Sequence, residues 1–351
     1  MKKRSAYKKT GAVLAAALLF LSLSGCASPD GADPLSEGFT KISEQEYEEA
    51  VALFETAADD RPREAERGKG IALLGEGKYD EAINCFEKAL SMSTGILNDM
   101  DFDLNYYLAL AFYKKGNRSE AAKIYDTILS LRPEETEALY LRGVLYAESG
   151  NGEGAKEHFD RMLALMPDDY DRLISVYTVL TQNGFSEIGE EYLNDMLRKD
   201  DKKLTNYERG ELFYYLGDYE SARTYLEKSG EEAGPETVLL LGRIYELLGD
   251  NNYAISVFST YLGTNDASPE ILNEMGMCRI AMGDYEGALR DFRSAMELPE
   301  NGLIQTLKYN EIVSLEYLGD FEGAKTLLDA YMRSFPDDER AEREAVFLST
   351  R

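Results

Sequence analysis

The sequence contains almost no histidine and little cysteine. His158 is the single histidine of the 351 residues, and there are only three cysteines. Most nucleophilic, general-base and zinc sites need a partner His or Cys at a defined spacing, and neither such a partner nor a glycine-rich phosphate loop lies near His158. We therefore expect His158 to be structural, and the chain to be no enzyme and to have no catalytic residue, metal or cofactor. An enzyme would need a pocket with converging polar groups around His158.

Two of the cysteines, Cys85 and Cys278, stand within expected helices among apolar neighbours. They are far apart in the sequence and have no metal-ligand spacing. Cysteine is among the residue types most often found in protein interiors. We expect both to be buried thiols.

Basic residues are also few, because 38 Lys and Arg oppose 65 Asp and Glu, for a formal net charge of −27. Such a charge repels phosphate backbones and anionic lipid surfaces, which excludes nucleic acid as a partner. The acidic residues have two interpretations. They attract basic partners, or they are the solvated faces of helices.

Long apolar runs are absent, and the one notable run, Gly11 to Leu23, is too short for a bilayer that needs about 20 residues. It follows a Lys- and Arg-rich start and ends in Leu23-Ser24-Gly25-Cys26. Residues 1–25 are therefore expected to be a cleaved export signal. Leu-Ser-Gly-Cys resembles the lipobox of bacterial lipoproteins, whose cysteine is diacylated; the alternative is an ordinary signal with a chance cysteine.

The lipobox resemblance implies lipidation of Cys26 and a location on the outer side of a bacterial cell membrane. With two membranes, that location is the periplasm or the outer membrane. The only membrane contact would be the N-terminal lipid. Residues 26–37 are small, polar and proline-containing, so we expect the lipidated cysteine to be followed by a flexible tether.

The main pattern of the chain is a decamer that recurs nine times. Successive copies begin 32 to 39 residues apart, at Gln45, Gly77, Gly116, Gly150, Gly184, Gly217, Gly249, Gly283 and Gly319. The sixth place is always Ala or Gly, and the tenth is always large and apolar. A period in the thirties indicates stacked supersecondary units.

The decamer predicts a turn followed by a helix. Glycine at the first place can adopt a positive φ and end one helix, and the Asp or Asn that often follows suits the start of the next. The sixth and tenth places lie on one helix face, so that two backbones approach at the small residue and the large side chain fills the space beside it. A small residue also recurs in the preceding helix, except at Tyr177 and Ile312.

This pattern resembles the tetratricopeptide (TPR) repeat. The residues that carry the resemblance are clearest in one unit, at Gly276, Gly283, Tyr285, Ala288, Phe292 and Ala295. The resemblance implies an all-α solenoid of about nine helix-turn-helix repeats over residues 31–338, with residues 339–351 as a capping helix. Units are expected near 31–62, 63–98, 102–135, 136–169, 170–202, 203–234, 235–268, 269–302 and 305–338. Unit five, with Gly189 at its sixth place, and the insertion within residues 91–101 are expected sites of a bend.

In this family the first helices line the concave face, and here tyrosine recurs along them. The expected groove residues are Tyr106, Tyr113, Tyr140, Tyr207, Tyr214, Tyr215, Tyr309 and Tyr317. Tyrosine combines a rigid apolar ring with a polar tip, which suits the binding of protein segments. The alternative is that these rings pack between neighbouring repeats.

The preferred hypothesis is a lipid-anchored scaffold of the bacterial cell envelope that binds other proteins in a tyrosine-rich groove. The alternative is a module that binds a glycan or another envelope polymer by ring stacking.

Overall fold

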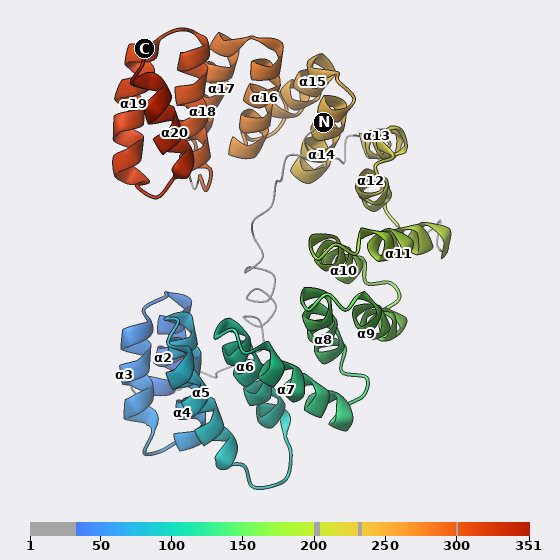
Figure 1. Cartoon of the computed structure of the whole chain (residues 1–351), viewed down its shortest axis with the longest axis vertical. Coiled ribbons are helices and arrows are strands. Elements are labelled where there is room, and N and C mark those ends of the chain that lie inside the picture. Colours follow the sequence, from blue (N-terminus) through green and yellow to red (C-terminus); the bar gives the residue numbers. More distant parts are fainter. Residues whose placement is uncertain (1–32, 200–203, 231–233, 300) are drawn as a thin grey trace. The chain divides into compact units, whose positions relative to one another are not determined.

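The computed structural model describes residues 33–199, 204–230, 234–299 and 301–351, which form nineteen α-helices and no strand. Nine consecutive helix pairs are followed by one more helix, so the predicted all-α solenoid of TPR-type repeats is confirmed (Figure 1). Contacts divide the chain into two compact units, with the division between Gly189 and Glu190. This division falls within repeat five, one of the two places where a bend was expected.

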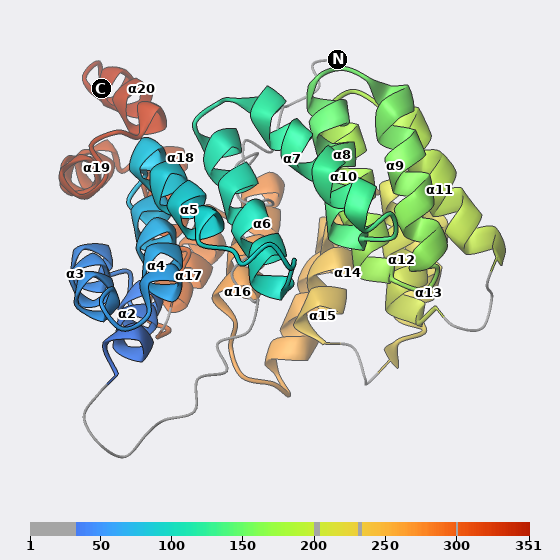
Figure 2. The same ribbon diagram turned by 90° about the horizontal axis from the view of Figure 1, so that it is seen from below.

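Unit 1 is a stack of helix pairs that follow one another in chain order (Figure 2). Its helices are α2 (Pro34–Ser43), α3 (Tyr47–Ala57), α4 (Pro62–Gly75), α5 (Tyr79–Ser91), α6 (Asp99–Lys114), α7 (Arg118–Leu131), α8 (Thr136–Glu148), α9 (Gly152–Leu165) and α10 (Tyr170–Gln182). Helix α11 (Ser186–Lys199) contains the division between the units.

Unit 2 continues the pattern of helix pairs. Its helices are α12 (Asn206–Tyr215), α13 (Tyr219–Glu227), α14 (Pro235–Leu247), α15 (Asn251–Leu262), α16 (Pro269–Met282), α17 (Tyr285–Met296), α18 (Ile304–Tyr317), α19 (Phe321–Ser334) and α20 (Glu339–Leu348). In both units the even-numbered helix is the first of each repeat. First helices pack on one another in the pairs α2 and α4, α4 and α6, α8 and α10, α12 and α14, and α14 and α16. We call the surface they form the first-helix face.

In most repeats the helix pair is closed by a small residue of the first helix that faces the large residue 16 positions later, at the tenth place of the decamer; the exceptions have Tyr177 and Ile312 at this place. A Cβ added to Gly276 would lie 2.5 Å from the Phe292 ring, which is a distance that real Cβ atoms do not adopt. Phe292 itself is fully buried. The same contact joins Gly38 to Phe54, Gly70 to Phe86, Gly143 to Phe159 and Gly242 to Phe258. The small residues are therefore part of the core.

The turns follow the predicted chemistry. Eight of the nine decamers begin with a glycine at φ between 77° and 89°, and the first begins with Gln45 at φ 63°. At Gly283 the left-handed residue ends α16, and the Asp284 carboxylate accepts the backbone N–H of Gly287 at 3.0 Å to cap α17. The left-handed glycine and the side-chain cap satisfy backbone groups that a helix end leaves unpaired.

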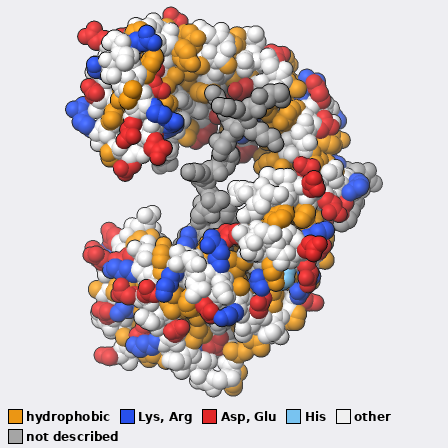
Figure 3. All heavy atoms as spheres, in the orientation of Figure 1, with side chains coloured by type: hydrophobic (Ala, Val, Ile, Leu, Met, Phe, Trp, Pro, Cys, Tyr) orange, Lys and Arg blue, Asp and Glu red, His pale blue; other side chains and the backbone are white. Residues whose placement is uncertain are grey.

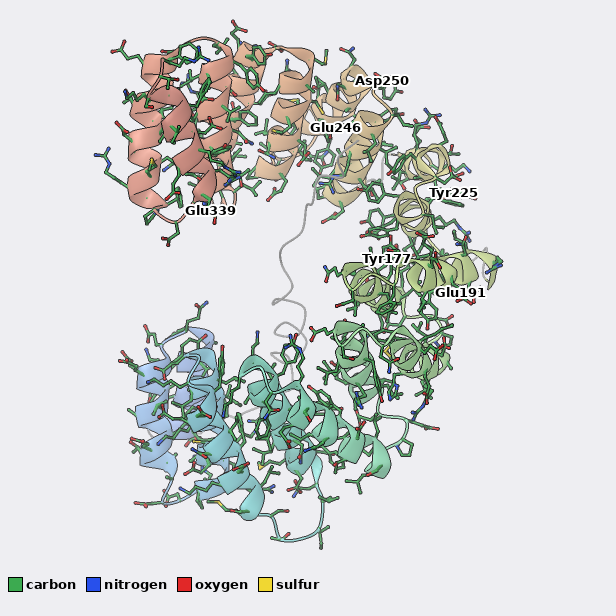
Figure 4. The ribbon with its side chains drawn as sticks, in the orientation of Figure 1. Tyr177, Glu191, Tyr225, Glu246, Asp250 and Glu339 are labelled. Atoms are coloured by element: carbon green, nitrogen blue, oxygen red, sulfur yellow. The ribbon has the colours of Figure 1, made fainter. Side chains whose placement is uncertain are left out.

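Repeat five keeps a large, buried tenth-place residue, Leu193, but has its glycine in the second helix. Tyr177 occupies the place where other first helices have a small residue (Figure 4), and a Cβ on Gly189 would lie 2.9 Å from the Tyr177 ring. The second helix thus supplies the glycine that the first helix lacks. Sequence reasoning recorded both exceptions but did not connect them, because the compensation is a contact between two helices.

The N-terminal boundary needs a correction. Residues 34–37, expected within the flexible tether, are the first turn of α2, which begins at Pro34 after the N-cap Asp33. Proline at the first helical position loses no hydrogen bond, so it starts a helix readily. Pro62 likewise opens α4. The expected signal peptide and lipidated Cys26 lie outside the described residues.

The expected capping helix is present as α20. Its Ala341 and Leu348 are buried in one cluster with Ile312, Leu328 and Tyr331 of the last repeat. This cluster gives the last repeat the apolar neighbour that every internal repeat has.

Two carboxyl groups meet where α20 packs on α18. Burial, together with the charge of the nearby Glu344 carboxylate, raises the pKa of Glu316 to about 7. The Tyr309 hydroxyl of α18 donates to Glu344 at 3.1 Å, and Arg340 of α20 lies over the Tyr309 ring. These four groups set the charge balance of the α18–α20 contact.

Replacing Ala288 by Phe should destabilise the protein by about 1–3 kcal/mol, because the Ala288 site is fully buried and an inserted ring overpacks it. Chemical denaturation measures the change in the free energy of unfolding. Ala281→Phe, at an exposed position of α16, is the matched control and should change stability little. Equal stability of the two variants would show that the decamer alanine does not set the helix spacing.

The raised pKa of Glu316 predicts a loss of stability as pH rises. An acid with a higher pKa in the folded than in the unfolded chain favours folding when protonated, and this contribution is lost between about pH 4.5 and 7. Glu316→Gln should therefore raise the melting temperature at pH 8 but leave it nearly unchanged at pH 4.5. Glu342→Gln, which removes an exposed carboxylate from α20, is the control. Identical pH profiles for both variants would contradict the assignment.

Candidate interaction surface

The eight expected groove tyrosines have different environments, and two of them are interior residues. Tyr106 is 6% exposed and Tyr140 is 2% exposed. The Tyr140 ring centre lies 6.0 Å from that of Phe159, and Tyr106 packs similarly on Tyr125. The expectation that these two rings line an open surface is therefore corrected. Each packs on the large tenth-place ring of its own repeat, and Arg172 of the next first helix also covers the Tyr140 ring.

Tyr113 and Tyr309 are half-buried and already bonded within the chain. Tyr113 donates its hydroxyl to Glu148 of the next first helix. Tyr309 makes the contacts with α20 described above. Burial, with the adjacent glutamate, raises the pKa of each hydroxyl to about 12, so both remain protonated donors at neutral pH.

Three of the tyrosines gather on α12 in unit 2. Tyr207, Glu211 and Tyr215 are four residues apart and share one helix face. Tyr215 donates to Glu211 at 3.4 Å. The Tyr214 ring centre is 5.6 Å from that of Tyr215. All three rings are half-buried, so each keeps part of its surface accessible.

Tyr317 is the most exposed of the eight, with 57% of its surface accessible. Its ring stacks on Tyr285 with centres 4.7 Å apart and planes within 5°. One ring face is therefore covered by the preceding repeat.

An apolar feature of unit 2 was missed by the sequence analysis. Leu247 is 50% exposed at the end of α14, and Met282 is 45% exposed at the end of α16. The position five residues after the small residue is occupied in unit 2 by Tyr215, Leu247, Ala281 and Tyr317, and in unit 1 by Ser43, Gly75, Lys114, Glu148 and Gln182. Counting from the small residue of each first helix would have revealed this difference.

Acidic residues accompany the apolar positions of this face. Glu211, Glu236 and Glu246 lie on α12 and α14, and Figure 4 marks Glu246. Across both units acidic and basic side chains are intermixed on the visible surface (Figure 3). Most acidic residues are thus consistent with solvated helix faces.

His158 and the two cysteines have structural surroundings. His158 is 9% exposed, its Nδ1 lies 3.0 Å from the Gly154 carbonyl oxygen, and burial lowers its pKa. Cys85 and Cys278 are buried free thiols, as expected, and burial raises the pKa of each to about 12. Within the described ranges, no group of three His, Cys, Asp or Glu is placed to hold a metal ion, and no helix is long and apolar enough to cross a membrane.

Comparison with known proteins gives one curated relative at low identity. A TPR repeat-containing protein of Methanocaldococcus jannaschii is 25% identical over 290 residues, which cover 75% of this chain and 42% of that protein. The chain therefore spans less than half the length of this relative.

Several solved structures share the fold at low similarity. A tetratricopeptide repeat protein from Parabacteroides merdae covers 80% of this chain and 97% of its own, with a TM-score of 0.42 and 18% identity. MamA from Desulfovibrio magneticus covers 49% and 99%, with a TM-score of 0.39 and 18% identity. A chain of the APC/C hetero-tetramer Cut9-Hcn1 covers 90% and 76%, with a TM-score of 0.42 and 13% identity.

The model of one family matches most of the repeats. It is described as Tetratricopeptide repeat and matches residues 41–95, 67–133, 106–170 and 207–270. These segments overlap and together include more than half of the sequence. They contain six of the nine decamers, those that begin at Gln45, Gly77, Gly116, Gly150, Gly217 and Gly249. The chain therefore belongs to the tetratricopeptide-repeat family.

Proposed function

We propose that this chain is a protein-interaction scaffold that binds partner segments along the first-helix face of unit 2. The observation that carries the proposal is the exposure of large apolar side chains at one repeated position. Leu247 and Tyr317 are both at least half exposed at the fifth residue after the small residue of their helices. Repeated exposed apolar side chains rimmed by polar groups are typical of interaction sites.

The fold supplies the rigid support that such a surface needs. The helices that carry Tyr215 and Leu247 are each closed against a second helix through Gly210 and Gly242. A surface fixed in this way loses little conformational entropy when a segment binds. Repeat arrays use extended surfaces of this kind for binding.

The glycan alternative is less well supported. Stacking on a sugar needs an open ring face, and of the eight tyrosines only Tyr317 has more than half of its surface accessible. One face of that ring already stacks on Tyr285. Protein segments can instead use ring edges, hydroxyl groups and the neighbouring leucine and methionine side chains.

We further propose that the scaffold is anchored by a lipid on Cys26, on the outer side of a bacterial membrane. The support is the sequence of the N-terminus, with its basic start, short apolar run and Leu-Ser-Gly-Cys motif. A diacylated cysteine would supply two acyl chains, which together hold a protein stably at a bilayer, whereas a single chain binds only weakly.

A photo-reactive phenylalanine analogue placed at residue 215 or 247 should cross-link partner proteins in cells, because both positions lie on the proposed surface. Gln182, the exposed residue at the equivalent position of unit 1, and Tyr253, exposed on the second helix α15, provide the controls. Mass spectrometry of the cross-linked bands gives the result. The same partners captured at all four positions, or at the control positions alone, would contradict the surface assignment.

Cys26→Ala should release the protein from the membrane fraction and abolish incorporation of an alkyne-labelled fatty acid, because it removes the acylated thiol. Cys85→Ala, at a buried helix position, is the control and should retain both properties. Labelling that survives Cys26→Ala would place the lipid elsewhere.

A further inference from the structure

The insertion between α5 and α6 carries two exposed apolar side chains. Gly95 turns the backbone at φ 86°, and Ile96 and Leu97 follow with 79% and 54% of their surface accessible. Figure 1 shows this connection extending past the ends of both helices. It spans seven residues, 92–98, whereas the other connections between repeats of unit 1 have four each, at 58–61, 132–135 and 166–169. The fold does not use Ile96 and Leu97, because neither is buried.

Exposed leucines of the next two repeats lie at the same border of the stack. Leu131 and Leu165 are the last residues of α7 and α9, and both are exposed. The two helices of a repeat are antiparallel, so each second helix ends where the next first helix begins. We call this border of unit 1 the inter-repeat edge. Its exposed apolar side chains are Ile96, Leu97, Leu131 and Leu165.

Side-chain contacts connect the start of α2 to this edge. Asp33, the N-cap of α2, pairs with Arg61 just before α4. Arg63, in the first turn of α4, donates to the carbonyl oxygen of Ala89 at 3.1 Å and pairs with Asp101 in the first turn of α6. The N-terminal end of the described chain therefore lies beside the helix ends that flank the insertion.

The same contacts continue to the leucines. Asp99, which follows the insertion, pairs with Arg132 at 3.0 Å, directly after Leu131. Arg161 of α9 donates to the carbonyl oxygen of Pro133 at 3.0 Å, one turn before Leu165. The apolar side chains thus belong to one continuous edge that begins at the start of α2.

This edge is also the one closest to the proposed lipid. Asp33 is seven positions after Cys26. A chain extends by at most about 3.6 Å per residue, so Asp33 lies within about 25 Å of an acyl group on Cys26. The opposite ends of the helices are about 20 Å further from Asp33, since a helix rises by about 1.5 Å per residue. A lipid on Cys26 would therefore hold the inter-repeat edge nearest to the bilayer.

We propose that the inter-repeat edge of unit 1 docks on the bilayer that holds the lipid anchor, with Ile96 and Leu97 inserted among the headgroups. The inference rests on the proposed lipid on Cys26 and adds a second, non-covalent contact to it, whereas the sequence predicted membrane contact through the lipid alone. Apolar side chains are stabilised on leaving water for the bilayer interface. The tether raises the effective concentration of the edge at the surface, so that a contact of few side chains suffices.

The charges of the edge favour neutral headgroups. The aspartates at its helix starts are paired with arginines, as described above. Asp59, Asp60 and Glu134 are further acidic residues of the edge, and all three are exposed. An anionic surface would repel them, most strongly at low salt, where screening is weak. The lipid that the edge fits is therefore zwitterionic.

The test reconstitutes the full-length, lipid-modified chain into phosphatidylcholine vesicles that contain a spin-labelled lipid quencher. Thr94→Cys, at an exposed position of the insertion, carries an environment-sensitive nitrobenzoxadiazole fluorophore and leaves Ile96 and Leu97 in place. The label is selective, because Cys85 and Cys278 are buried and a lipid would block the Cys26 thiol. We expect the fluorophore at residue 94 to be quenched by the lipid.

A second reporter and two variants provide the controls. Ser119→Cys, exposed in the first turn of α7 at the opposite end of the helices, should show little quenching. The double variant Ile96→Ser, Leu97→Ser should lower the ratio of docked to undocked chain about tenfold or more, because it removes both inserted side chains. Val346→Ser, at an exposed apolar residue of α20, should leave the ratio unchanged. Thermal melting of each variant confirms that it is folded.

The lipid composition gives a further check. Vesicles that contain phosphatidylglycerol should quench the fluorophore at residue 94 less at low salt than vesicles of phosphatidylcholine alone. Stronger quenching by the anionic vesicles would overturn the proposal. Equal quenching at residues 94 and 119, or quenching that survives the loss of Ile96 and Leu97, would do the same. A response at residue 94 that requires membrane proteins would assign the edge to a protein partner instead.

Mass spectrometry of the purified chain separates this inference from the proposed function. An acylated chain that shows no quenching at residue 94 removes the docking and leaves the anchor intact. A chain without acyl groups removes the proposed anchor and, with it, the tether on which the docking rests. Cross-linking at residues 215 and 247 tests the scaffold function independently, because the docking uses side chains of unit 1 only.

Discussion

The contact on which the rest of the structure depends joins a small residue of most first helices to the large residue 16 positions later. Where both are standard, as at Gly276 and Phe292, a single added methyl group would overlap the ring. The contact fixes how closely the two helices of a repeat approach and how they are rotated about their axes. The turn glycine, such as Gly283 at φ 80°, then only has to reverse the direction of the chain between the two helices.

Once the helices are fixed in this way, the first helices have one face left for other uses. Residues of this face are not needed to close the repeat, so their character can differ between the units. Unit 1 has polar residues such as Gln182 at a position where unit 2 has Tyr215 and Leu247. The difference leaves the packing of the repeat intact, because the position lies outside the small–large contact.

Whether a tyrosine of this face is accessible depends on the side chains that the next helix places over it. Tyr140, Tyr207 and Tyr309 occupy equivalent positions, yet Tyr140 is buried under Arg172 and Tyr309 is held by α20. Tyr207 is instead half-buried, with Glu211 one turn further along its own helix. A list of tyrosines at the right spacing therefore overestimates the binding surface, since the spacing does not report what the neighbouring helix supplies.

The sequence by itself determined the helical class, the number of repeats, the turn glycines and the capping helix, because all of these follow from local propensity and from a period that is repeated nine times. Burial of Cys85 and Cys278 followed from their apolar neighbours. Tertiary structure alone decided that Gly189 compensates for Tyr177, that Tyr106 and Tyr140 are interior, and that Glu316 meets Glu344. Each of these is a contact between helices, and such contacts depend on side-chain volume and charge across an interface that no single helix encodes.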